Sequence, residues 1–122
     1  MKLFSSLVLL VLLSFASTAT ALDLCYTEST TGARYAFKKV KVPKQGEDAL
    51  PLLGVKNGVL GVFGTLFRFS EGALGLNVVA DGCFVTGTLD TNFDGDVTQN
   101  CEPIGGGIVG YTWTRVDCDA DI

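Results

Sequence analysis

The segment from Asp90 to Thr98 carries the side chains best suited to binding a metal ion. It reads Asp-Thr-Asn-Phe-Asp-Gly-Asp-Val-Thr, which matches the first half of an EF-hand-type calcium loop. Gly95 stands where such a loop must turn sharply. The candidate ligands are oxygen-bearing residues at alternate positions: Asp90, Asn92, Asp94 and Asp96. Calcium is therefore the one cofactor that the sequence suggests, and no other cofactor is expected.

Two features of this segment favour a metal-free turn instead. Cys101 occupies the twelfth loop position, where a calcium loop has a bidentate glutamate. The residues before Asp90 have the pattern of a strand, whereas an EF-hand needs a helix there. Asp and Asn side chains also cap hairpin turns without any metal. Both interpretations, the calcium site and the turn, stay open at this point.

An aromatic face on the last expected strand, residues 108–118, could bind a ligand. Tyr111, Trp113 and Arg115 alternate along this strand and so share one face. Such a face could stack on a sugar ring, and Tyr35 and Phe37 could extend it. The alternative is that Trp113 fills the core with its indole N–H hydrogen-bonded.

A run of basic residues lies in the first half of the chain, at Lys38, Lys39, Lys41 and Lys44. Four positive charges on one strand and the loop after it could contact an acidic polysaccharide or an anionic lipid. The alternative is a solvated strand edge, where lysines discourage aggregation.

Catalysis is difficult to build from this composition. The chain has no histidine, which excludes Ser-His and Cys-His nucleophiles. Asp94 and Asp96 could pair as an acid and a base, but they fall in an exposed turn. We therefore expect that the protein is not an enzyme, and a secreted hydrolase is the least favoured function.

The first 21 residues have the pattern of a cleaved signal peptide. Lys2 supplies a positive charge, residues 7–13 supply an apolar stretch, and Ala19-Thr20-Ala21 supplies a cleavage site. The apolar stretch is about half of the ~20 residues that span a bilayer. We expect a secreted protein, extracellular or at the cell surface, with a single domain over 22–122 and no transmembrane segment in the mature chain.

Charge and cysteine content agree with an extracellular domain. Removal of residues 1–21 leaves eight basic and thirteen acidic residues. A net-acidic chain is a poor partner for nucleic acid, which needs an excess of lysine and arginine. The four cysteines allow three pairings, of which Cys25–Cys118 with Cys83–Cys101 is favoured, because it ties the two chain ends and two neighbouring strands. The wide cysteine spacing disfavours the alternative, a zinc site.

Short apolar runs separated by turn signals predict an all-β fold. Asn57-Gly58 and Asp81-Gly82 are two-residue hairpin signals between apolar runs. Residues 34–42 change phase at Lys38-Lys39, where a β-bulge would bring Tyr35, Phe37, Val40 and Val42 onto one side. The pattern indicates a small antiparallel barrel or sandwich of six to eight strands with two disulfides.

The function expected for such a domain is binding. The first hypothesis is a small apolar or sugar ligand inside a barrel. The alternative is an extracellular structural or protein-interaction module with no small ligand. The expected partners are thus a small ligand, a glycan or an extracellular protein.

Overall fold

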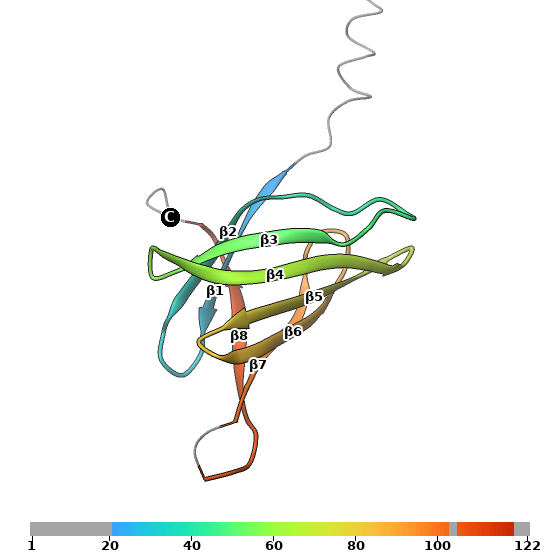
Figure 1. The fold of residues 1–122 in the computed structure, drawn as a ribbon. Helices are drawn as coiled ribbons and strands as arrows, with labels where there is room; N and C mark the ends of the chain where they lie inside the picture. Colours follow the sequence, from blue (N-terminus) through green and yellow to red (C-terminus); the bar gives the residue numbers. More distant parts are fainter. Residues whose placement is uncertain (1–20, 103–104, 119–122) are drawn as a thin grey trace, which may run out of the picture.

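The protein folds as a closed barrel of antiparallel strands (Figure 1). The computed structural model describes residues 21–102 and 105–118. The strands are β1 (Leu22–Glu28), β2 (Arg34–Val40), β3 (Leu50–Lys56), β4 (Val59–Ser70), β5 (Ala73–Ala80), β6 (Cys83–Leu89), β7 (Gly95–Cys101) and β8 (Val109–Val116). Each strand pairs with the next in the sequence, and β1 closes the barrel on β8. The all-β prediction is confirmed, with the barrel as its form.

Parts of the chain that carry sequence-based predictions lie outside the described residues. These are residues 1–20 of the predicted signal peptide and the acidic tail at 119–122. Among the described residues, no helix has the length and hydropathy needed to cross a membrane.

The connections divide the barrel into two ends. The hairpin end carries the β1–β2, β3–β4, β5–β6 and β7–β8 connections, and the terminal end carries the other three with the start of β1 and the end of β8. Asn57-Gly58 and Asp81-Gly82 form the two predicted tight hairpins. All four residues have positive φ, at 49°, 83°, 56° and 74° respectively, as this turn requires. These short turns set the strand register at the hairpin end.

Side chains fill the interior of the barrel. Alternate residues of each strand point inward, because successive side chains leave opposite faces of a sheet. The inward set contains large apolar residues that are almost fully buried: Leu24, Tyr26, Tyr35, Phe37, Leu66, Leu74, Leu76, Val85, Leu89, Val97 and Trp113. Phe93, from the β6–β7 connection, joins this core at the terminal end. The barrel is therefore a packed core.

Both predicted disulfides are present. Cys25 in β1 bonds to Cys118, two residues after β8, across a sequence separation of 93. Cys83 and Cys101 join β6 to β7 across a separation of 18. No thiol remains free, so the cysteines do not form the alternative zinc site.

The predicted bulge in β2 is also confirmed. Leu22 pairs with Val40 but Leu24 pairs with Phe37, so β2 holds one more residue than β1 in this interval. Lys39 adopts a positive φ of 57°, and its backbone N–H donates to the Asp23 carboxylate at 3.0 Å. The extra residue places both Phe37 and Val40 in the core.

Candidate functional site

The barrel opens slightly between β2 and β3, near the terminal end. The β2–β3 ladder contains only three residue pairs, the fewest of any neighbouring strands in the described barrel. The bulge at Lys39 turns β2 away after Phe37. On the opposite strand, Pro51 has no N–H to donate to a ladder. We call this opening the seam.

Gly54 permits the close packing that ends the ladder at the seam. A Cβ atom on Gly54 would lie 2.6 Å from the ring of Phe37 and 2.8 Å from the carbonyl oxygen of Ala36. Only a residue without a side chain fits at this position. Phe37 therefore packs directly on the β3 backbone and forms part of the floor of the seam.

The seam contains a groove of about 200 Å³ with an apolar floor and a basic rim. Its lining consists of Phe37, Lys38, Lys39, Val40, Lys41, Leu50, Pro51, Leu52 and Leu53. Phe37, Val40 and Leu52 are buried, whereas the three lysines are exposed. None of these lysines forms an ion pair with another residue in the described part of the chain. The groove thus combines hydrocarbon contact with uncompensated positive charge.

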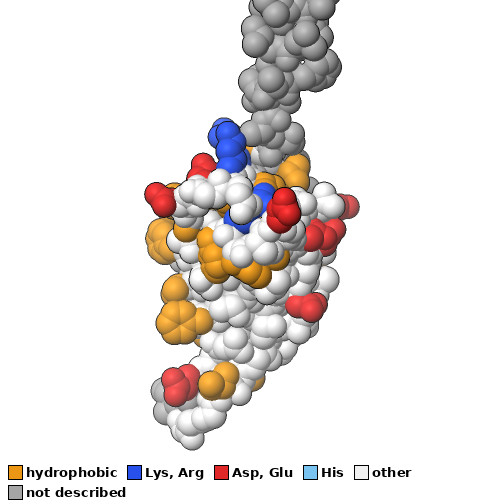
Figure 2. Space-filling model, turned by 90° about the vertical axis from the view of Figure 1, so that its right-hand side faces the viewer, with side chains coloured by type: hydrophobic (Ala, Val, Ile, Leu, Met, Phe, Trp, Pro, Cys, Tyr) orange, Lys and Arg blue, Asp and Glu red, His pale blue; other side chains and the backbone are white. Residues whose placement is uncertain are grey.

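The β2–β3 connection that borders this groove is fixed by hydrogen bonds. The Lys44 N–H donates to the Glu47 carboxylate at 2.7 Å, and the Glu47 N–H donates to the Lys44 carbonyl at 3.0 Å. Arg68 of β4 donates from Nε to the Pro43 carbonyl at 2.9 Å and from Nη1 to the Glu71 carbonyl. Figure 2 views the side of the barrel that carries this connection, where Lys and Arg side chains lie next to hydrophobic ones.

A larger depression of about 320 Å³ lies on the outer face of β1 to β3, beside Arg34 and Asn57. Arg34 is the one cation in its lining, and it is already engaged in an interaction. The seam groove is smaller but carries three cations with no ion-pair partner among the described residues. We therefore regard the seam groove as the candidate site.

The predicted calcium ligands form a hydrogen-bonded turn. The Asp90 carboxylate accepts from the backbone N–H groups of Asn92 and Asp94, at 2.8 and 3.1 Å. Arg115 donates to the Asn92 carbonyl at 2.7 Å and to the Asp94 carboxylate at 3.0 Å. Asp96 lies on β7, opposite Thr88. Within the described residues, no group of three or more acidic, Cys or His side chains is arranged to hold a metal ion. Calcium binding stays a prediction.

Of the three residues on the predicted aromatic face, Trp113 lies in the barrel core, whereas Arg115 is exposed. Trp113 is 2% exposed, stacks on Tyr35 with ring centroids 4.1 Å apart, and donates from Nε1 to the Gln99 side-chain oxygen at 2.9 Å. The alternative of a hydrogen-bonded core residue is confirmed. Tyr35 covers one face of the indole, and sugar binding by Tyr111, Trp113 and Arg115 stays a prediction. Tyr111 is partly buried, and Arg115 contacts the β6–β7 connection.

Tyr26 carries a buried hydroxyl with no hydrogen-bond partner among the described residues. Burial raises its pKa to about 12, an effect that the positive charge of Arg115 partly opposes. The ring lies 5.6 Å from that of Trp113, in the core of the barrel. This tyrosine is therefore a neutral part of the interior near physiological pH.

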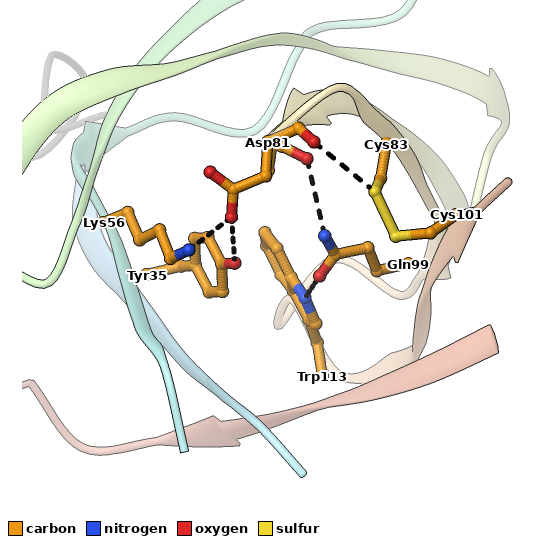
Figure 3. The surroundings of a disulfide bond; sticks show 8 residues. Tyr35, Lys56, Asp81, Cys83, Gln99, Cys101 and Trp113 are labelled. Carbon is orange, nitrogen blue, oxygen red and sulfur yellow. Dashed lines mark hydrogen bonds and ion pairs between the residues drawn. A yellow bond between two sulfur atoms is a disulfide. The ribbon is translucent and has the colours of Figure 1, made fainter. Parts of the chain in front are cut away.

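A polar network closes the hairpin end (Figure 3). Lys56 forms an ion pair with Asp81, whose carboxylate also accepts from the Tyr35 hydroxyl at 3.5 Å. The hydrogen bond to Asp81 raises the pKa of Lys56, and burial raises the pKa of Tyr35. Gln99 donates to the Ala80 carbonyl at 3.4 Å, beside the Cys83–Cys101 disulfide. Sequence reasoning missed this network. The two hairpin signals, which place Lys56 and Asp81 beside turns at one end, could have indicated it.

Glu28 organises the β1–β2 turn, and its charge should make the stability of the protein depend on pH. Burial disfavours its charged form, but hydrogen bonds from Thr31 and Thr30 outweigh that effect and hold the pKa of Glu28 below its usual value. A lowered folded-state pKa stabilises the fold above the unfolded-state pKa, and this contribution disappears as the pH falls through the folded-state value. We expect wild type to be more stable than Glu28→Gln at neutral pH, with a difference that narrows below about pH 4.5.

Urea unfolding of both proteins between about pH 7 and about pH 3 measures this difference. Glu28→Gln keeps the size of the side chain, removes its charge, and replaces one of its two acceptor oxygens with an NH2 donor. A difference that stays constant over the whole range would contradict the assigned role of Glu28.

Comparison of the chain with protein-family models, curated protein sequences and solved structures finds no match.

Proposed function

We propose that the protein is an extracellular binding domain whose site is the seam groove. Its ligand is a small amphipathic anion, with a hydrocarbon body and a carboxylate, sulfate or phosphate head. The observation that carries the proposal is the convergence of three lysines on an apolar groove, with no ion-pair partner among the described residues. The proposal is for a binding role, not a catalytic one.

The floor of the groove suits a hydrocarbon chain. Phe37, Val40 and Leu52 offer apolar surface that belongs to the barrel core. Each methylene group that leaves water contributes about 0.8 kcal/mol. The groove is smaller than the ~300–1,000 Å³ of typical ligand pockets, so it would hold one segment of an alkyl chain. The packed interior supports a site in the barrel wall, not a ligand at the barrel centre.

The rim of the groove suits an anionic head group. Lys38, Lys39 and Lys41 lie within four residues of one another on β2 and the start of the next connection. Each exposed cation contributes roughly 0.2–1 kcal/mol to an ion pair, and salt weakens that contribution. Together with three or four buried methylenes, this gives roughly 3–6 kcal/mol of binding free energy and predicts a dissociation constant between roughly 30 μM and a few millimolar.

Isothermal titration with decyl phosphate, kept below its micelle concentration, tests the proposal. We expect saturable binding that weakens about tenfold or more when Lys38, Lys39 and Lys41 are all changed to glutamine. Lys44→Gln is the matched control, because Lys44 belongs to the same basic cluster but does not line the groove. It should leave the affinity within about twofold. Thermal unfolding confirms that each variant is folded.

Two further probes test the ligand. One compares the head group alone with the head group plus its hydrocarbon chain, and the other tests whether the head group belongs to a membrane lipid. Inorganic phosphate should bind more weakly than decyl phosphate, because it leaves the apolar floor empty. Vesicles of anionic phospholipid test whether the head group comes from a membrane surface. Binding of vesicles without binding of decyl phosphate would overturn the proposal of a small-ligand site, as would equal affinities of the triple variant and the wild type.

A further inference from the structure

An exposed apolar row crosses the outer face of four neighbouring strands. Leu53 pairs with Phe63, Phe63 pairs with Val79, and Val79 pairs with Phe84. These four side chains therefore form one line across β3, β4, β5 and β6, which lie side by side in Figure 1. Their exposed fractions are 56%, 56%, 46% and 68%. We call these four residues the apolar row.

One of the rows next to the apolar row on the outer face is neutral. This row consists of Thr65, Asn77 and Thr86, again matched by register. A shallow groove of about 410 Å³ runs between the two rows, and Phe63, Val79 and Phe84 border it. Its lining contains no acidic or basic residue. Covering this face would thus remove apolar surface from water without desolvating an ion.

The apolar row is long for the water-exposed face of a sheet. Single exposed apolar residues are common, but a contiguous set marks an interaction surface. The strands of a closed barrel are paired on both sides, so a partner cannot add a strand here and must contact the side chains. The four residues supply roughly half of the ~800 Å² per partner in a standard interface, since an aromatic residue buries ~150–250 Å². The neutral Thr65–Asn77–Thr86 row can supply much of the rest.

We infer that a second copy of this chain covers the apolar row and forms a two-fold symmetric dimer. In such a dimer one patch contacts itself, so each contact occurs twice. A two-fold axis between Phe63 and Val79 sets Phe63 against the partner subunit's Val79. The same axis sets Phe84 against the partner subunit's Leu53. Each contact joins a larger side chain to a smaller one, which allows the two rows to interdigitate.

Charge also favours contact through this face. The chain has a net charge of −4, so two copies repel each other over most orientations. The apolar row and its neutral neighbour avoid that repulsion at close range. The inference is independent of the proposed function, except that Leu53 also lines the seam groove. The variants below therefore leave Leu53 unchanged.

Sedimentation velocity over about 1–100 μM protein tests the inference, because dimer formation depends on concentration. We expect a dimer for the wild type, and monomers for Phe63→Glu and for Val79→Lys. Phe69→Ser is the matched control, since Phe69 is 55% exposed but lies outside the row, and it should remain dimeric. A wild type that is monomeric throughout the range would overturn the inference, as would a dimer lost only in Phe69→Ser.

A mixture of the two charged variants tests the symmetry itself. In the inferred dimer, one copy of Phe63→Glu would set its new carboxylate against the new ammonium of a Val79→Lys copy. The second contact in that pair, between Val79 and the partner subunit's Phe63, is unchanged. We therefore expect the mixture to form a heterodimer although each variant alone is monomeric. A mixture that stays monomeric would overturn the two-fold pairing.

Discussion

Trp113→Ala is expected to lower the free energy of unfolding by about 3–5 kcal/mol, the usual cost of removing a large buried aromatic side chain. Trp113 is almost fully buried, and its ring contacts those of Tyr35 and Tyr26. Its removal leaves a cavity in the core. The strands around this cavity cannot easily move to fill it, because hairpins fix their register. The substitution also leaves the buried Gln99 oxygen without its indole donor. Urea unfolding followed by far-ultraviolet circular dichroism measures the loss.

Trp113→Phe tests the same site with a smaller loss of packing. Phenylalanine keeps one aromatic ring beside Tyr35 and lacks the second indole ring together with its N–H. We expect a loss of at least about 1–3 kcal/mol, the cost of a buried polar group without its partner, and a smaller loss than for Trp113→Ala. A loss below about 1 kcal/mol for Trp113→Ala would contradict the assignment of Trp113 to the core.

Removal of the Cys25–Cys118 disulfide is expected to destabilise the protein by about 2–5 kcal/mol. The bond joins the first strand to the residues after the last one, and it closes a loop with a sequence separation of 93. Chain entropy predicts ~4.7 kcal/mol for a loop of that order and ~3 kcal/mol for one near the length of the Cys83–Cys101 loop. Against a typical stability of ~5–15 kcal/mol, either loss is large.

The two double variants, Cys25→Ala with Cys118→Ala and Cys83→Ala with Cys101→Ala, control for each other. Each removes two sulfur atoms from the same fold, and they differ mainly in loop length. Denaturant unfolding should rank the first pair as the more destabilising. The reverse order would mean that local contacts, not chain entropy, determine what each bond contributes.

The candidate site was only partly predictable from the sequence. The lysine cluster and the bulge at Lys38-Lys39 were both identified, because charge and a shift in strand phase are local properties. The groove that the lysines form with Leu52 and Pro51 was not predicted. It depends on how far β2 and β3 pair before they separate. The calcium-like spacing that begins at Asp90 shows that a local motif can also suggest a site without showing which distant residues contact it. Local spacing cannot reveal that Arg115, from β8, contacts Asp94.

The sequence by itself determined the strands, the tight hairpins and the residues that alternate along each strand. The reason is that positive φ at Asn57-Gly58 and a side-chain period of two are properties of a few consecutive residues. The even number of cysteines, together with the pattern of a signal peptide, likewise indicated two disulfides.

Only the tertiary structure decided which apolar residues are buried. Phe63, Val79 and Phe84 resemble core residues in the sequence, yet they face outward, whereas Trp113 faces inward. Barrel closure selects one face of every strand for the interior at once, and that selection depends on register between strands far apart in the sequence. The exposed apolar row and the basic rim of the seam both result from which face of each strand is buried. The sequence of a single strand does not contain that information.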